Sequence, residues 1–143
     1  TRIGNNVNAG SDYLPTKGKS EPGAPKFSGA IGLTYDDGTW FGNFNLRYQD
    51  SQYSTLMNDQ SIPAYFTGDL SLGRHLPSFG RFHPKGMLNL INVGGVNYLS
   101  SISGFGITAV KQKGIFGNVV NASAPSYVVG SAFTAMFTLS ADF

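Results

Sequence analysis

The stretch that decides the fold is the last one, Phe133-Thr134-Ala135-Met136-Phe137-Thr138-Leu139-Ser140-Ala141-Asp142-Phe143. Every odd position is apolar, and the even positions are mostly small and polar. Because successive side chains of a strand point to opposite faces, this alternation predicts a β-strand with one apolar side. Such a strand suits the last strand of a soluble sandwich or a lipid-facing strand of a transmembrane β-barrel, so the rest of the chain must decide between the two.

The composition favours a chain that faces lipid on one side and water on the other. Only 13% of the 143 residues are charged, about half the usual share of roughly 25% in globular domains. Aromatic residues make up 13% of the chain, and there are 19 glycines. The net charge of +2 is small and its Lys and Arg residues are scattered, so we expect no nucleic-acid partner.

Two further classes of protein are excluded by composition. The chain has no cysteine, which rules out a disulfide framework and a thiolate metal site. It has no run of about 18 apolar residues, which rules out a membrane-spanning helix. It also lacks an initiator Met and a signal peptide, so we expect it to be a processed or excised piece of a longer protein.

Period-two alternation recurs along the chain. Residues 1–25 are rich in Asn, Gly and Pro and are expected to form a loop. Asp36-Asp37-Gly38-Thr39 joins two alternating segments, and Asp-Gly in this setting is a strong signal for a tight hairpin. The strands that we expect span about 26–36, 39–49, 64–74, 86–93 and 127–143.

The polar sides of these strands favour a membrane barrel over a sandwich. Asn43, Asn45, Arg47 and Gln49 share one side of the second strand, and Asp69 lies on the polar side of the third. These side chains would be costly in the dry core of a sandwich but cost little in a wet barrel lumen. We therefore predict that they face a lumen, where they either contact a translocating ligand or a plug or simply wet the wall.

The loop lengths predict an incomplete barrel. Counting back from Phe143, long connections (99–125 and 50–63) alternate with short ones (76–85 and 36–39), as in outer-membrane barrels with short periplasmic turns. Five strands would then place residue 1 outside the cell. A complete barrel begins in the periplasm and needs at least about eight strands, so residues 1–143 are expected to be the C-terminal part of a larger barrel domain.

Several short pieces of the sequence stand in a specific order and spacing: Pro25 to Gly29, Leu33 to Tyr35, Trp40 to Tyr48, Ile62 to Tyr65, Asp69-Leu70, Asn97 to Leu99 and Tyr127 to Phe143. In this order and spacing the chain resembles the C-terminal barrel segment of a known family, the TonB-dependent outer-membrane receptors. The likeness covers roughly residues 14–143. Two departures are Gly94-Gly95-Val96, where family members often have Asn-Leu, and Ala132-Phe133, where they often have Pro-Arg.

This resemblance implies a 22-stranded, plugged barrel in the outer membrane of a Gram-negative bacterium, importing a scarce ligand such as a siderophore, cobalamin or a glycan. The implied partners are the lipid bilayer, the rest of the barrel with its plug domain, and TonB through a missing N-terminal part. The aromatic C-terminal strand, with Phe137, Leu139 and Phe143, resembles the recognition signal of the barrel-assembly machinery.

The sequence supports no enzyme and no cofactor. No Ser-His-Asp arrangement has a recognisable context, and His75, His83 and Asp69 match no metal-ligand spacing. The alternative to a receptor is a small β-barrel with a binding or structural role, either lipocalin-like or an eight-stranded outer-membrane protein. Aromatic residues near the predicted strand ends, such as Trp40, are expected to form interfacial girdles.

Overall fold

The computed structural model describes residues 1–142 and contains two compact units. The sheet unit consists of residues 28–48, 65–97 and 131–143, and the loop unit consists of residues 1–27, 49–64 and 98–130. All regular structure within residues 1–142 is β-structure, and no helix suitable for crossing a bilayer occurs there. The predicted all-β class is therefore confirmed.

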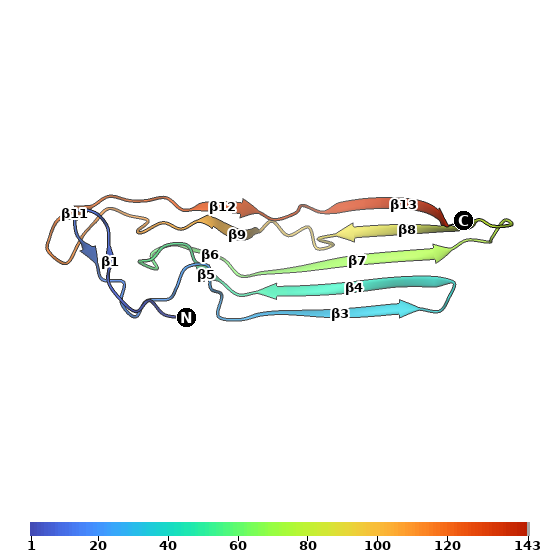
Figure 1. Cartoon of the computed structure of the whole chain (residues 1–143), viewed down its shortest axis with the longest axis horizontal. Coiled ribbons are helices and arrows are strands. Elements are labelled where there is room, and N and C mark those ends of the chain that lie inside the picture. Colours follow the sequence, from blue (N-terminus) through green and yellow to red (C-terminus); the bar gives the residue numbers. More distant parts are fainter. Residues whose placement is uncertain (143) are drawn as a thin grey trace. The chain divides into compact units, whose positions relative to one another are not determined.

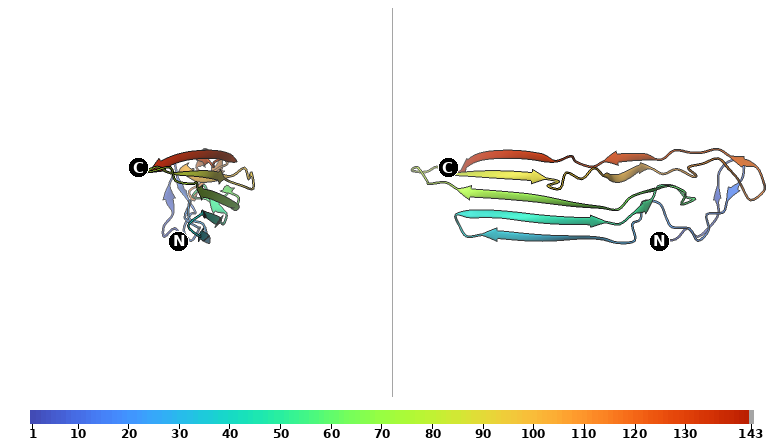
Figure 2. Two further views of the ribbon diagram at one scale, coloured as in Figure 1. Left: turned by 90° about the vertical axis from the view of Figure 1, so that its right-hand side faces the viewer. Right: turned by 180° about the vertical axis from the view of Figure 1, so that it is seen from behind.

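The sheet unit is one five-stranded antiparallel sheet. Neighbouring strands run in opposite directions in the front view (Figure 1) and again in the view from behind (Figure 2). Its order is β13-β8-β7-β4-β3, so each strand pairs with a neighbour close to it in the sequence except where β13 joins β8. The strands are β3 (Ser28–Asp36), β4 (Trp40–Gln49), β7 (Tyr65–His75), β8 (His83–Ile91) and β13 (Thr134–Asp142).

The register of the sheet places apolar residues of neighbouring strands beside one another in one row and mainly polar residues in the next. In one row, Leu88 of β8 pairs with Leu72 of β7 and with Phe137 of β13. In the next row, Asn89 pairs with Ser71 on one side and with Met136 on the other. Because the side-chain period of a strand is two, the sheet has an apolar face and a mainly polar face.

The hairpin between β3 and β4 forms where Asp-Gly predicts it. Gly38 has a positive φ of 81°, which an L side chain adopts only with strain. The side chain of Asp37 accepts hydrogen bonds from the backbone N–H groups of Thr39 (2.9 Å) and Trp40 (2.6 Å). The turn is therefore closed by its own side chains.

The loop unit contains four short strand pairs rather than one sheet. Three pairs are two residues long on each side, and the fourth joins longer strands. They are β1 (Val7–Asn8) with β2 (Tyr13–Leu14), β5 (Gln52–Tyr53) with β6 (Ser61–Ile62), β10 (Gln112–Lys113) with β11 (Val119–Val120), and β9 (Leu99–Gly104) with β12 (Ser126–Val129).

Two expectations about these segments are wrong. The final strand is not continuous from 127, because β12 ends at Val129 and β13 begins at Thr134 in a different sheet. Gly130 packs its backbone against the ring of Tyr98 and donates its N–H to the Tyr98 carbonyl (2.8 Å), which ties this break to β9. The expected loops 1–25, 50–63 and 99–125 also contain paired strands.

Among the described residues of the sheet unit, no large apolar side chain is buried. Within residues 1–142 the buried hydrophobic residues are Leu14, Ile62 and Val120, which all belong to the loop unit. On the apolar face of the sheet, Leu33 is 66% exposed and Phe137 is 70% exposed. A contiguous apolar face of this kind marks a surface that meets another apolar medium or partner.

Two glycines in adjacent strands give a test of this packing. A Cβ on Gly42 would lie 2.5 Å from the backbone oxygen of Ser71, which cannot move without breaking the pairing of β4 with β7. A Cβ on Gly32 would meet only the side-chain oxygen of Asn45 at 2.8 Å, which can rotate away. We expect Gly42→Ala to lower the free energy of unfolding by about 1–3 kcal/mol, and Gly32→Ala to change it by less than about 0.5 kcal/mol.

The measurement is urea unfolding of the full-length protein in lipid vesicles, followed by tryptophan fluorescence. Equal stability of the two variants would contradict the packing described here.

Candidate functional site

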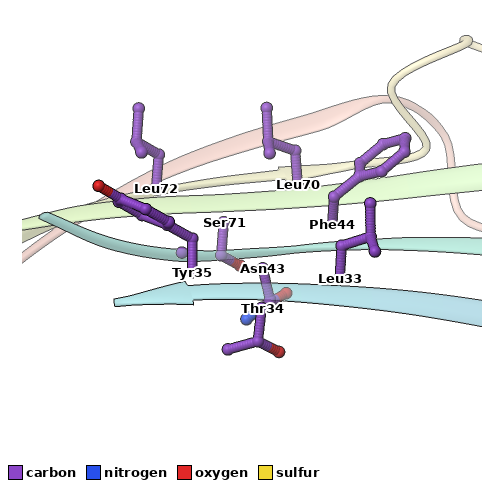
Figure 3. A pocket seen from close by; sticks show the side chains of 9 residues that line it. Leu33, Thr34, Tyr35, Asn43, Phe44, Leu70, Ser71 and Leu72 are labelled. Carbon is purple, nitrogen blue, oxygen red and sulfur yellow. The ribbon is translucent and has the colours of Figure 1, made fainter. Parts of the chain in front are cut away.

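The apolar face carries a shallow hollow over Gly42. Figure 3 shows Leu33, Tyr35, Phe44, Leu70 and Leu72 projecting to one side of the sheet, and Thr34, Asn43 and Ser71 projecting to the other. The hollow has a volume of ≈ 210 Å³. Its walls are hydrocarbon with the Tyr35 hydroxyl at one end, so it suits apolar groups rather than a reaction.

The opposite face is polar, and its side chains bond one another. Asn45 donates to Asn43 (3.1 Å) within β4, and Ser71 of β7 donates to Asn89 of β8 (2.7 Å). A Cβ on Gly32 would touch the Asn45 side chain, which places Asn45 on the same side as the even-numbered positions of β3. The strand alternation puts the exposed Arg47 side chain on this face as well.

This polar face is hollowed near the β3–β4 hairpin. The hollow has a volume of ≈ 390 Å³ and is lined by residues of all five strands, among them Asp36, Phe41, His75 and Lys85. The Lys85 ammonium pairs with the Asp142 carboxylate at 3.0 Å across β8 and β13. Charged and polar groups gather on this face, as a surface that meets water requires.

The Asp69 side chain binds the backbone of Asn92. Its carboxylate accepts the backbone N–H of Asn92 at 2.9 Å, at the point where β8 ends. The side chain of Asn92 is 1% exposed and donates to the carbonyls of Val96 (2.8 Å) and Ser131 (2.9 Å). Asp69 therefore helps to hold the turn after β8.

Gln49, another residue predicted to face the lumen, ends β4 and belongs to the loop unit.

The lumenal roles of Asn43, Asn45, Arg47, Gln49 and Asp69 stay predictions. The same holds for the assembly signal in the last strand. Phe137 and Leu139 lie on the apolar face and are 70% and 66% exposed, and Phe143 lies outside the described residues.

The two histidines lie at the turn end of the sheet. The ring of His75 packs against Phe41 with centroids 4.9 Å apart, and Nδ1 of His83 lies 2.9 Å from Oγ of Ser78. Within residues 1–142 no group of three or more His, Cys, Asp or Glu side chains is arranged to hold a metal ion.

A carboxylate that the sequence does not single out joins two long loops. Asp59 accepts hydrogen bonds from the Thr55 hydroxyl (2.6 Å), the Thr108 hydroxyl (2.9 Å) and the Ala109 backbone N–H (2.9 Å). Partial burial raises the pKa of Asp59, but these donors outweigh it and leave the pKa below its ordinary value of 3.8. No local pattern could reveal this role, because Ala109 is 50 residues away in the chain.

A second carboxylate, that of Asp12, joins the N-terminal segment 1–25 to the loop 99–125. Asp12 is 3% exposed and accepts the backbone N–H groups of Tyr13 (2.6 Å), Phe116 (3.0 Å) and Asn118 (2.9 Å). Burial raises the pKa of Asp12, but the three N–H donors together lower it below its ordinary value. The loop unit is thus held by buried polar groups as well as by its few buried hydrophobic residues.

The net charge of the chain resides in the loop unit. The sheet unit has four basic and four acidic side chains, whereas the loop unit has six basic and four acidic ones. The basic residues are Arg2, Lys17, Lys19, Lys26, Lys111 and Lys113.

The fold matches segments of two solved receptor structures. One is BauA, the ferric preacinetobactin receptor from Acinetobacter baumannii, with a TM-score of 0.62 and 16% identity over 96% of this chain. The other is the ferric citrate transporter FecA in its unliganded form, with a TM-score of 0.61 and 17% identity over 89% of this chain. The chain spans 17% and 18% of their lengths, respectively.

The sequence itself matches no protein-family model and no curated protein. At identities of 16% and 17% the likeness is one of fold. This likeness of fold confirms the resemblance to TonB-dependent outer-membrane receptors that we inferred from the sequence.

The Asp59 cluster predicts a local effect of mutation. Asp59→Asn removes the charge that attracts the Ala109 N–H, and should make opening of that amide about 1–2 kcal/mol easier, a small value because the carboxylate is partly solvated. Asp50→Asn is the matched control in the same loop, because Asp50 accepts only from the adjacent Ser51. Hydrogen exchange of the full-length protein should show faster exchange near Ala109 in Asp59→Asn alone.

The lowered pKa values of Asp12 and Asp59 predict that the loop 99–125 loses its order only in acid. Both folded-state values lie below the ordinary 3.8, so the stabilisation is complete above that pH and is lost as the pH falls through the folded values. We expect protease protection of residues 105–120 to be constant between about pH 5 and 8 and to fall only when the pH drops below the ordinary carboxyl pKa of 3.8. Loss of protection near pH 6 would contradict this assignment.

Proposed function

We propose that this chain forms part of the barrel wall of a TonB-dependent outer-membrane receptor in a Gram-negative bacterium. The receptor would take up a scarce ligand such as a siderophore, cobalamin or a glycan. One observation carries the proposal. The sheet unit exposes a whole apolar face and bonds its polar side chains on the other, and it does so in the fold of a receptor segment.

Burial energetics support a lipid environment for the apolar face. Removing a Leu or Phe side chain from water contributes about 1.5–3 kcal/mol, and this face leaves Ile31, Leu33, Leu72, Phe137 and Leu139 between 45% and 70% exposed. A bilayer covers them without any protein partner. In lipid, every backbone group must also be paired, so the outer edges of β3 and β13 require neighbouring strands from the remainder of a closed barrel.

The polar face would line the lumen of this barrel. Asn43, Asn45 and Arg47 would then meet water, the plug domain or the passing ligand. TonB would act on a part of the receptor outside this chain. Phe137, Leu139 and Phe143 would serve the barrel-assembly machinery during insertion.

The charge of the loop unit supports an anionic ligand among the proposed classes. Its six basic side chains outnumber its four acidic ones. A basic surface raises the local concentration of an anion and speeds its capture. A negatively charged ferric chelate would suit this surface better than a neutral glycan.

The first test is the state and size of the native protein. We expect it in the outer-membrane fraction, with altered gel mobility when unboiled and an intact mass several times the 15.2 kDa of this chain. Uptake of radioactive ferric citrate, ferric hydroxamate or labelled cobalamin by cells with this receptor should then require TonB. A native polypeptide of 15.2 kDa that stays folded without detergent would instead support the small-barrel alternative.

A pair of adjacent substitutions tests which face meets lipid. Phe44→Arg places a charge on the apolar face and should destabilise the membrane-inserted protein by about 2–4 kcal/mol if it lies near the bilayer midplane. Asn43→Arg places the same charge on the polar face, where Asn43 is exposed, and should have little effect. The readout is the folded, unboiled fraction on a gel after refolding into vesicles. Equal tolerance of both changes would contradict a lipid-facing role.

A further inference from the structure

The apolar face carries one charged residue, Arg74, although the alternating pattern of the strands predicts apolar residues on this face. Among the described positions of β3, β4, β7, β8 and β13 that point to this face, Arg74 alone is charged. It is exposed, and it lies next to the end of β7. A charge facing lipid is costly at the midplane but costs only about 0–1 kcal/mol near the interface.

Arg74 has an aromatic partner and no acidic one within residues 1–142. Its guanidinium carbon lies 5.1 Å from the centroid of the Trp40 ring. The ion pair found in this part of the chain joins Lys85 and Asp142 instead. This cation–π contact with Trp40 engages the charge of the guanidinium and does not use its N–H groups as hydrogen-bond donors to an acceptor oxygen.

An apolar groove begins beside Arg74. Its volume is ≈ 270 Å³, and Trp40, Leu72, Phe137 and Leu139 are among the residues that line it. In the sheet register Gly86 pairs with Arg74 on one side and with Leu139 on the other. Gly86 has no side chain, and the ring of Phe137 lies beside it, 3.4 Å from where a Cβ on Gly86 would be. The row therefore has a cation on one side of Gly86 and hydrocarbon on the other.

We propose that this groove binds a membrane phospholipid, with its phosphate on the Arg74 guanidinium and one acyl chain along its apolar lining. A guanidinium donates two parallel hydrogen bonds to a phosphate, and the continuous apolar lining selects a lipid over free phosphate. Trp40 at the start of β4 suits the headgroup level, where tryptophan is enriched. This site rests on the proposed function, because it requires the apolar face to lie in a bilayer.

The experiment uses the detergent-extracted full-length protein and native mass spectrometry. Phosphatidylglycerol is titrated, and bound lipid is counted on the folded species. We expect Arg74→Gln to weaken binding about fivefold, the factor that one basic residue near an anionic lipid contributes. Gly86→Leu should fill the groove and weaken binding similarly without removing charge. Arg47→Gln is the control, with the same charge change on the polar face.

Other ligands in the same assay identify the source of the phosphate. Glycerol phosphate, which has no acyl chain, should fail to displace the lipid. Unchanged binding in Arg74→Gln, an equal loss in Arg47→Gln, or dependence on Arg74 only for lipopolysaccharide would each overturn the proposal. Outer-membrane location and gel mobility of the wild type, measured on the same preparation, test the proposed function separately.

Discussion

The structure depends on one constraint, that each strand of the five-stranded sheet has an apolar side that residues 1–142 leave exposed. In a soluble domain such a sheet would be packed against a second layer, and its leucines and phenylalanines would be buried. Here the buried hydrophobic residues of the described chain lie in the loop unit instead. The sheet therefore presents one face that suits an apolar medium or partner and one face whose polar side chains bond one another across the strands.

The loop unit is stabilised in a different way from the sheet unit. Its segments lack enough apolar surface for a large core, so carboxylates and hydroxyls with several donors or acceptors hold them together. Asp12 and Asp59 each gather backbone N–H groups from a loop far away in the sequence, and Asn58 bonds the backbone of Ser20 in both directions. Such networks order long loops while leaving their surfaces free for recognition.

Deviations from the alternating pattern are informative because the pattern is otherwise so regular. Gly42 and Gly86 omit side chains on the apolar face and leave hollows there. Arg74 adds a charge to the same face at a position next to an aromatic ring. Residues that break a local rule in a consistent structure are the ones most often retained for a function.

The sequence by itself determined the long strands of the sheet to within a few residues, apart from the start of the last one, together with their two faces and the Asp-Gly hairpin, because a period of two and a turn dipeptide are local properties. It placed Asn43, Asn45 and Arg47 on the polar side for the same reason. Only the tertiary structure decided that the final stretch divides between β12 and β13, since that break depends on pairing with β9 and on Tyr98 beside Gly130. It also decided that Asp69 holds the turn at Asn92 and that Asp59 reaches Ala109, because those partners lie 23 and 50 residues away and no local pattern encodes them.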